Sequence, residues 1–148
     1  MADHEVEQTV AVWARSRWDA QPWLERRMGH TLADNLAFFR GTVMKTTEVW
    51  VAARGDAIVG LLALAPGRVE HLYVDPPAQG QGIGSALLDH AKRLTPDGLT
   101  LFTHQRNRRA RAFYEGRGFR AVAFGVSPAP ESEPDVEYRW DGAAALVS

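Results

Sequence analysis

The N-terminal third of the chain has apolar residues at helical spacing. Val6, Val10 and Trp13 recur every three or four residues, which predicts a first helix over residues 3–19. A second, short helix can begin at Pro22 and end at Gly29. A third is indicated by a capping residue and an apolar stripe: Thr31, then Leu32, Leu36, Phe39 and Val43. We expect this helical region, residues 1–46, to lie on one side of a sheet.

The rest of the chain alternates between strand and helix patterns. Turn residues separate three β-rich segments and predict antiparallel strands at 48–54, 57–65 and 68–74. Amphipathic helices are predicted at 82–94 and 107–115, and further strands at 99–103, 119–126 and 136–140. Residues 127–135, rich in proline and acidic residues, are predicted to be a loop. The order predicts an α/β or α+β fold with a mixed sheet, and right-handed crossovers would place both later helices against it.

Composition excludes several classes of function. The chain has 148 residues, the size of one domain, with 45% hydrophobic and 24% charged residues. A net charge of −1 gives no overall attraction to nucleic acid or to an anionic membrane. The absence of cysteine excludes disulfides, thiolate zinc sites and a cysteine nucleophile, and the five histidines lack metal-ligand spacing. No run approaches the ~20 apolar residues of a membrane span, and the N-terminus is acidic, so we expect a soluble cytoplasmic protein.

The segment Val69–Ser85 combines an apolar strand, a Pro-Pro break and a glycine-rich turn that opens a helix. The first backbone N–H groups of a helix have no internal partner and carry partial positive charge. Gly80, Gly82 and Gly84 leave room for a phosphate to approach them. The Walker loop and the dinucleotide fingerprint both fit poorly, because the Lys-Ser/Thr pair and the third glycine gap are missing. A strand–helix turn without a ligand is the alternative at this point.

Two spacings together indicate a family. Gln79, Gly82 and Gly84 form Gln-x-x-Gly-x-Gly, which resembles the pyrophosphate-binding signature of the GCN5-related N-acetyltransferases (GNAT). Asn107 to Phe119 matches every specified position of that superfamily's second signature, Asn-x-x-Ala-x-x-Phe-Tyr-x-x-x-Gly-Phe. The resemblance covers most of the chain from residue 48 onward. It implies a mostly antiparallel sheet with a splayed central strand. Members usually open with a strand, whereas a helical pattern begins here near residue 1, so that strand is absent or the chain is shortened.

The resemblance implies an enzyme that transfers the acetyl group of acetyl-coenzyme A to a primary amine of a small molecule, or of a peptide, by direct attack in a ternary complex. It assigns the pyrophosphate to the glycine turn, the pantetheine arm to the splayed strand, and the oxyanion to a backbone N–H near Leu72–Val74. The cofactor-binding residues expected on this basis are Leu72, Tyr73, Val74, Gln79, Gly80, Gln81, Gly82, Ile83, Gly84, Ser85, Asn107 and Tyr114.

Tyr114 is expected to be the general acid that protonates the departing thiolate. It lies two turns beyond Asn107 on one helix face, and Asn107 would bind the pantetheine, cap the helix, or do both. Free pKa values of about 10 for tyrosine and about 8.5 for a thiol make the transfer mildly uphill, so placement decides it. The alternative is a core tyrosine with a satisfied hydroxyl.

Glu70 is the candidate base. Strand alternation places it on the face of Leu72 and Val74, and a buried site there would raise the pKa of its carboxyl. A surface or hydrogen-bonded glutamate is an equal alternative. His71 would lie on the other face and is the weaker candidate. Six arginines surround the second signature and could meet the ribose phosphate, although a solvated helix face is favoured for most: Arg106, Arg108, Arg109, Arg111, Arg117 and Arg120.

The acceptor should bind between the N-terminal aromatic residues and the late acidic loop, in a site suited to a small amine. The residues concerned are Trp13, Trp18, Trp23, Phe38 and Phe39, with Glu131, Glu133 and Asp135 opposite. The chain is then one acetyltransferase domain: an acceptor-side helical region at 1–46, a cofactor-binding core at 47–126, and a loop and last strand at 127–148. The alternatives are a non-catalytic acyl-CoA-binding or sensing domain, and an acyltransferase acting on a protein or aminoacyl-tRNA amine. A homodimer, common in the family, is also possible.

Overall fold

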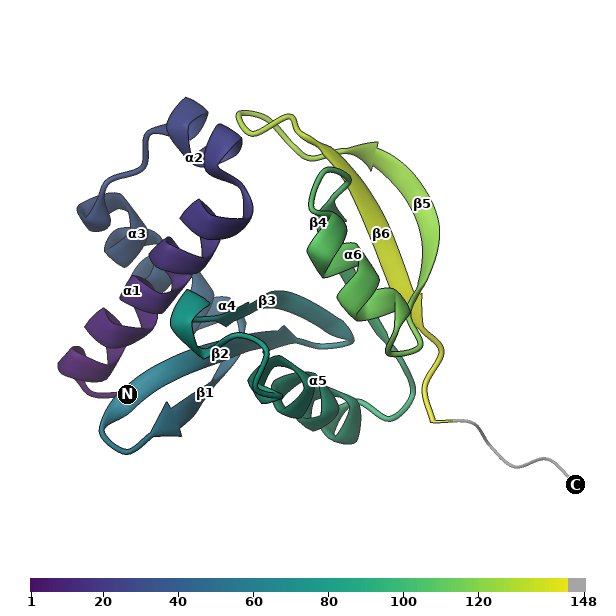
Figure 1. Ribbon diagram of the computed structural model, residues 1–148, viewed down its shortest axis with the longest axis horizontal. Coiled ribbons are helices and arrows are strands. Elements are labelled where there is room, and N and C mark those ends of the chain that lie inside the picture. Colours follow the sequence, from purple (N-terminus) through teal and green to yellow (C-terminus); the bar gives the residue numbers. More distant parts are fainter. Residues whose placement is uncertain (144–148) are drawn as a thin grey trace, which may run out of the picture.

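A computed structural model describes residues 1–143 of the chain (Figure 1). The N-terminal region is helical, as expected, and comprises α1 (Asp3–Ala20), α2 (Pro22–Met28), α3 (Leu32–Phe38), the π-helix η1 (Phe39–Val43) and α4 (Met44–Thr46). Gly29, with φ 65°, ends α2. Thr31 caps α3, because its Oγ1 accepts a hydrogen bond from the Asp34 N–H at 3.1 Å and Asp34 accepts one in return.

Six strands form a single sheet in the order β1-β2-β3-β4-β6-β5. Their bounds are β1 (Glu48–Arg54), β2 (Ala57–Ala65), β3 (Arg68–Val74), β4 (Leu99–His104), β5 (Arg120–Val126) and β6 (Pro134–Trp140). All neighbouring strands are antiparallel except β3 and β4. The mixed, mostly antiparallel sheet is therefore confirmed. Within residues 1–143 no strand precedes α1, in agreement with the helical pattern there.

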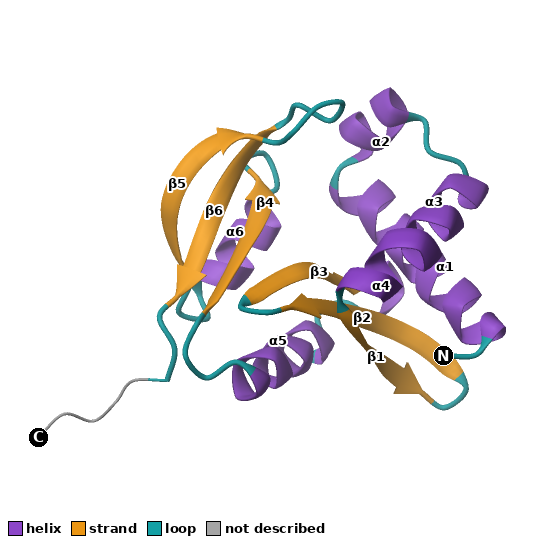
Figure 2. Ribbon diagram, turned by 180° about the vertical axis from the view of Figure 1, so that it is seen from behind, coloured by secondary structure: helices purple, strands orange, loops and turns teal. Residues whose placement is uncertain are grey.

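Helices cover both faces of the sheet (Figures 1 and 2). Alternation along β2 sends successive side chains to opposite faces, so that each face has its own core. On one face α1 and η1 pack in a cluster of Val6, Val10, Val12, Trp13, Phe39, Val43, Ile58, Leu61 and Ala63. On the other face lie α5 (Ile83–Leu94) and α6 (Arg108–Glu115), with Leu62, Leu64, Val69, Leu87, Leu88, Ala91, Leu99, Leu101, Tyr114, Phe119, Val136 and Tyr138. The crossover rule placed α5 and α6 correctly.

The sheet divides between β3 and β4. These parallel strands pair only at Arg68–Thr100 and Val69–Leu101, and beyond this point β3 has no strand beside it on that side. The splay of the central strand is confirmed, and it opens the edge of residues 70–74. The short 3₁₀ helix η2 (Pro76–Ala78) then leads from β3 to α5.

Two predictions need correction. The loop expected at 127–135 is shorter, because β6 begins at Pro134, which pairs with Val126. Strict alternation along β3 is also wrong. The register against β2 pairs Ala63 with His71 but Leu64 with Val69, which leaves Glu70 as the extra residue of a β-bulge. No helix of the described residues is long and apolar enough to cross a membrane.

Candidate active site

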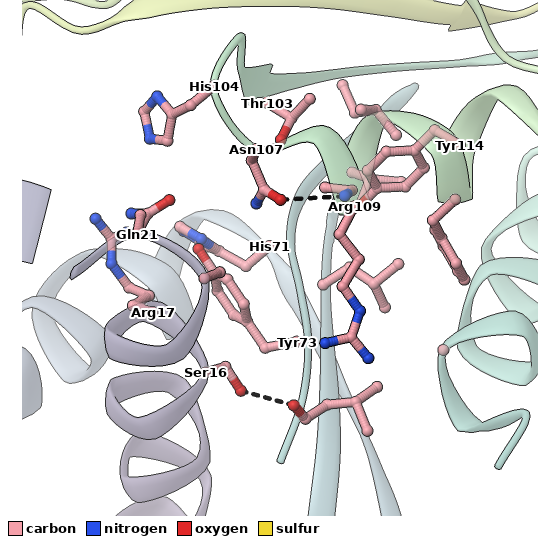
Figure 3. A pocket seen from close by; sticks show the side chains of 18 of the residues that line it. Ser16, Arg17, Gln21, His71, Tyr73, Thr103, His104, Asn107, Arg109 and Tyr114 are labelled. Carbon is pink, nitrogen blue, oxygen red and sulfur yellow. Dashed lines mark hydrogen bonds between the residues drawn. The ribbon is translucent and has the colours of Figure 1, made fainter. Parts of the chain in front are cut away.

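The splay between β3 and β4 opens into a cavity of about 1200 Å³. Its walls come from α1 on one side, α6 on the other, and the free end of β3 between them (Figure 3). The glycine turn before α5 forms one end, and the β5–β6 loop reaches the other. Every cofactor-binding residue predicted from the sequence lines this cavity except Gln81. The two signatures, 25 residues apart from Gly82 to Asn107, therefore meet at one site.

The turn presents a row of free backbone donors. The N–H groups from Gly80 to Ser85 donate no hydrogen bond to any described residue, and the first helical bond of α5 is from Ala86 to Gly82. Gly80 and Gly82 have φ values of 78° and 85°, a left-handed conformation that glycine adopts without strain. Such consecutive donors at a helix N-terminus form a site for an anion. The turn thus has the backbone geometry that such a site requires, and we call the free N–H groups of Gly80–Ser85 the cradle.

Side chains around the turn hold it in place rather than enter the anion site. Gln79 Nε2 donates to the Val74 carbonyl at 3.0 Å, and Ser16 Oγ of α1 donates to the same oxygen at 2.8 Å (Figure 3). Ser85 Oγ accepts hydrogen bonds from the Arg117 guanidinium at 2.7 and 2.9 Å. A Cβ on Gly84 would lie 3.3 Å from the Phe113 ring, so this glycine permits close packing of α5 on α6.

Tyr114 lies in the wall formed by α6, only 8% exposed, and its hydroxyl bonds to no described residue. Tyr114 thus belongs to the core of this face, as the alternative expected, but no described residue forms a hydrogen bond with its hydroxyl. Burial, reinforced by the nearby Tyr73 hydroxyl, raises the pKa of Tyr114, so the group stays protonated at neutral pH. Asn107 caps α6, since its Oδ1 accepts from the Ala110 N–H at 3.1 Å (Figure 3).

The environment expected for Glu70 is wrong. Glu70 sits at the bulge with its side chain 36% exposed, 3.4 Å from the Arg68 guanidinium, at the rim of the cavity. His71 is the more enclosed group: its ring lies 4.7 Å from that of Trp13 and 6.0 Å from that of Tyr73. Burial, with a smaller contribution from the Arg17 cation, lowers the pKa of His71 to about 4. Its imidazole is therefore neutral at pH 7.

Sequence reasoning missed Arg17, a cation on the buried face of α1. Its side chain is 15% exposed and lines the cavity, with Nε 2.6 Å from Glu25 and NH2 3.8 Å from Glu131. Burial alone would lower the pKa of Arg17, but the neighbouring Tyr73, Glu25 and Glu131 raise it on balance. A signal was available, because Arg17 continues the stripe of Val6, Val10 and Trp13 one turn further.

The other predicted acceptor-site residues separate into groups. Trp13 and Phe39 are buried in the core, whereas Trp18 and Phe38 are exposed and do not line the cavity. Glu131 and Asp135 do line it.

The six arginines around the second signature differ in their surroundings. Four of them line the cavity, Arg106, Arg108, Arg109 and Arg117, while Arg111 bonds to Tyr138 and Arg120 to Asp141. No group of three or more His, Cys, Asp or Glu side chains in residues 1–143 could hold a metal ion.

Comparison with known proteins supports this geometry. Residues 45–121 match the family described as "Acetyltransferase (GNAT) domain". A "Peptidyl-lysine N-acetyltransferase YjaB" of Salmonella typhimurium is 32% identical over 80% of this chain and 79% of its own. The solution structure of apo-form YjaB from Escherichia coli superposes with a TM-score of 0.78, at 26% identity over 95% of this chain and 93% of that one.

A structure with the bound donor is also similar. The putative streptothricin acetyltransferase from Bacillus anthracis, in complex with acetyl-coenzyme A, superposes with a TM-score of 0.59 over 66% of this chain and 64% of that one, at 22% identity. Acetyl-coenzyme A is the acyl donor of the family, and the chain has the fold, the cradle and both signatures that go with it. The chain belongs to the GNAT superfamily of acetyl-coenzyme A-dependent N-acetyltransferases.

Proposed function

We propose that this enzyme transfers the acetyl group directly to a primary amine in a ternary complex, and that the amine is the side chain of a peptidyl lysine. The observation that carries the mechanism is that the Tyr114 hydroxyl lines the same cavity as the free N–H groups of the glycine turn. Burial raises the pKa of this hydroxyl, which keeps its proton available. One cavity thus offers a site for the donor's pyrophosphate and a proton for its sulfur.

The donor would lie along the open edge of β3. Its pyrophosphate would accept hydrogen bonds from the turn, and the extended pantetheine would pair with residues 70–74 in the way that an added strand pairs with a sheet edge. Arg108, Arg109 and Arg117 supply positive charge on the α6 side, where phosphate groups would be placed.

The reaction needs one proton to leave and one to arrive. The neutral amine attacks the thioester carbon, and a backbone N–H of β3 near Leu72–Val74 would stabilise the oxyanion. The C–N bond forms and the C–S bond breaks as the thiolate takes the Tyr114 proton. The amine proton leaves through water at the cavity mouth, where Glu70 is exposed. Tyr114 then regains a proton from solvent.

Two observations favour a peptide's lysine side chain over a small-molecule amine, the two acceptors that the sequence left open. A relative matched over four-fifths of the chain is named a peptidyl-lysine N-acetyltransferase. The end of the cavity away from the glycine turn, which we call the acceptor end, also combines the neutral ring of His71 and the ring of Tyr73 with the carboxylates of Asp19, Glu131 and Asp135. This combination suits an aliphatic stem that ends in an amine.

The test is an acetylation assay with purified enzyme and acetyl-coenzyme A. A peptide with one lysine is compared with the same peptide carrying norleucine and with free small amines, by thiol release and mass spectrometry. Acetylation of the lysine peptide alone, or at much the highest rate, would support the proposal. Turnover of free amines without the peptide would contradict the acceptor, and binding of the donor without any transfer would favour the sensing domain.

A further inference from the structure

Three segments distant in sequence meet beside the acceptor end of the cavity: α2, the turn between β4 and α6, and the β5–β6 loop. In Figures 1 and 2 the tip of the β5–β6 loop lies beside α2, across the opening between the helical region and the sheet. Trp23 of α2 donates from Nε1 to Glu133 Oε1 at 2.9 Å. The Arg106 guanidinium lies 4.2 Å from the centre of the Trp23 ring and 3.7 Å from the same carboxylate oxygen. We call Trp23, Arg106 and Glu133 the clamp.

Glu133 is a buried carboxylate that is paired with several donors. Only 3% of the residue is exposed, and carboxylates are buried at this level only when they are paired. Its two oxygens face Trp23, Arg106 and Arg27, the last at 3.3 Å. The Glu133 N–H also donates to Ser127 Oγ at 3.0 Å, which fixes the loop on itself. The carboxylate therefore connects α2 to the sheet side of the molecule by charge and by hydrogen bonds.

The clamp borders the acceptor end of the cavity. Glu133 does not line the cavity, but Arg106 does, and so does Glu131, two residues earlier in the loop. Glu131 lies 3.5 Å from His104 of β4 and 3.8 Å from Arg17 of α1, so its carboxylate bridges the two sides of the acceptor end. Fixing Glu133 thus fixes the separation of α1 from β4 where the acceptor must lie.

We propose that the clamp sets the width of the acceptor end and so restricts the enzyme to slender, unbranched alkylamines. The inference rests on the proposed function in one respect only, the choice of lysine as the acceptor. With the clamp in place, Glu131 is held between Arg17 and His104 and would narrow this end of the cavity, so that bulkier amines would require α2 and the loop to separate. Glu133, Trp23 and Arg106 are positioning residues, since none of the three is assigned contact with the reacting atoms.

The experiment uses Glu133→Gln, which keeps an acceptor for Trp23 but removes the charge that Arg27 and Arg106 face. The matched control is Glu137→Gln, four residues later on β6, which lies outside the cavity and has no ion pair among the described residues. We expect the KM for the lysine peptide to rise about tenfold in Glu133→Gln, as for the loss of a charged hydrogen bond. We expect kcat to stay within about threefold and acetyl-coenzyme A affinity by calorimetry within about twofold. In the same variant, kcat/KM for a peptide with branched, γ-methylated lysine should rise relative to that for the peptide with plain lysine.

A second variant covers the case in which Glu133→Gln does not fold. Trp23→Phe keeps an aromatic ring under Arg106 and removes only the N–H donor, and it should show the same KM change at smaller size. Unchanged acceptor KM and unchanged preference for branched lysine in a folded variant would overturn the clamp. If the wild-type enzyme acetylates free amines and not peptides, lysine is not its acceptor. The clamp is then tested by comparing linear with branched free amines as substrates of the wild type and the variants. If no acceptor turns over, faster hydrogen exchange at 22–28 in the variant supports the clamp, and unchanged exchange overturns it.

Discussion

His71 makes a testable contribution to the pH dependence of stability. Its ring is enclosed between Trp13 and Tyr73, and burial lowers its pKa from 6.5 to about 4 in the folded chain. Because the folded pKa lies below the unfolded value, the unfolded chain binds a proton between pH 6.5 and 4 that the folded chain does not bind. Stability therefore rises with pH through this window and falls on acidification.

The magnitude follows from linkage. One pKa unit corresponds to about 1.36 kcal/mol, so lowering the pH from 7.5 to 5 should cost about 2 kcal/mol of unfolding free energy through His71 alone. His104, whose pKa burial also lowers, contributes in the same direction. For that reason the unfolding free energy of the wild type is compared with that of a His71 variant at each pH, since the pH dependence of the wild type alone contains both histidines.

The assay is urea unfolding at pH 7.5, 6 and 5 for the wild type and for His71→Phe, which keeps a ring between Trp13 and Tyr73 but cannot take a proton. The wild type should lose about 2 kcal/mol more than the variant over this range. His30→Phe, at an exposed position, is the control and should follow the wild type. Equal pH dependence in wild type and His71→Phe would refute the claim that His71 is neutral in the folded state.

Two further predictions concern the cradle and the base. Gly82→Ala should cost about 1–2 kcal/mol in stability, because φ is 85°, and should also weaken acetyl-coenzyme A binding about tenfold in calorimetry. Gly29→Ala, at φ 65° but outside the cavity, should show similar strain and normal binding, and equal binding loss in both would refute the cradle. Glu70→Gln should keep kcat within about threefold at pH 8, because the exposed carboxylate faces Arg68; a hundredfold loss in kcat would restore its role as the base.

Local signals in the sequence predicted most of the fold. The strands at 48–54, 57–65 and 68–74 have the predicted bounds, since the Gly55-Asp56 and Pro66-Gly67 turns mark each end. The free N–H groups at Gly80–Ser85 and the cap at Asn107 follow from residues within one turn of each other. Such features depend on local backbone preferences, which a segment has without contacts to the rest of the chain.

What could not be predicted depends on contacts between distant segments. The bulge that exposes Glu70 is set by the register of β3 against β2, and period-two alternation cannot anticipate an extra residue. The burial of Glu133 requires Trp23 and Arg106, which are 110 and 27 residues away. From the sequence alone a charged loop residue is expected to be exposed to solvent, because the partners that bury it cannot be identified. Arg17 is the exception, because its spacing from Trp13 places it on the apolar stripe of α1 in the sequence itself.

The most direct test of the mechanism is the turnover of Tyr114→Phe with acetyl-coenzyme A and the best acceptor. The lost hydroxyl bonds to no described residue, so its removal should leave the fold and the affinity for acetyl-coenzyme A nearly unchanged. We expect kcat to fall by roughly 10²–10⁴, the usual contribution of a general acid, with donor affinity by calorimetry within about twofold of the wild type. Full turnover in the folded variant would contradict the acid role of Tyr114 and with it the proposed mechanism.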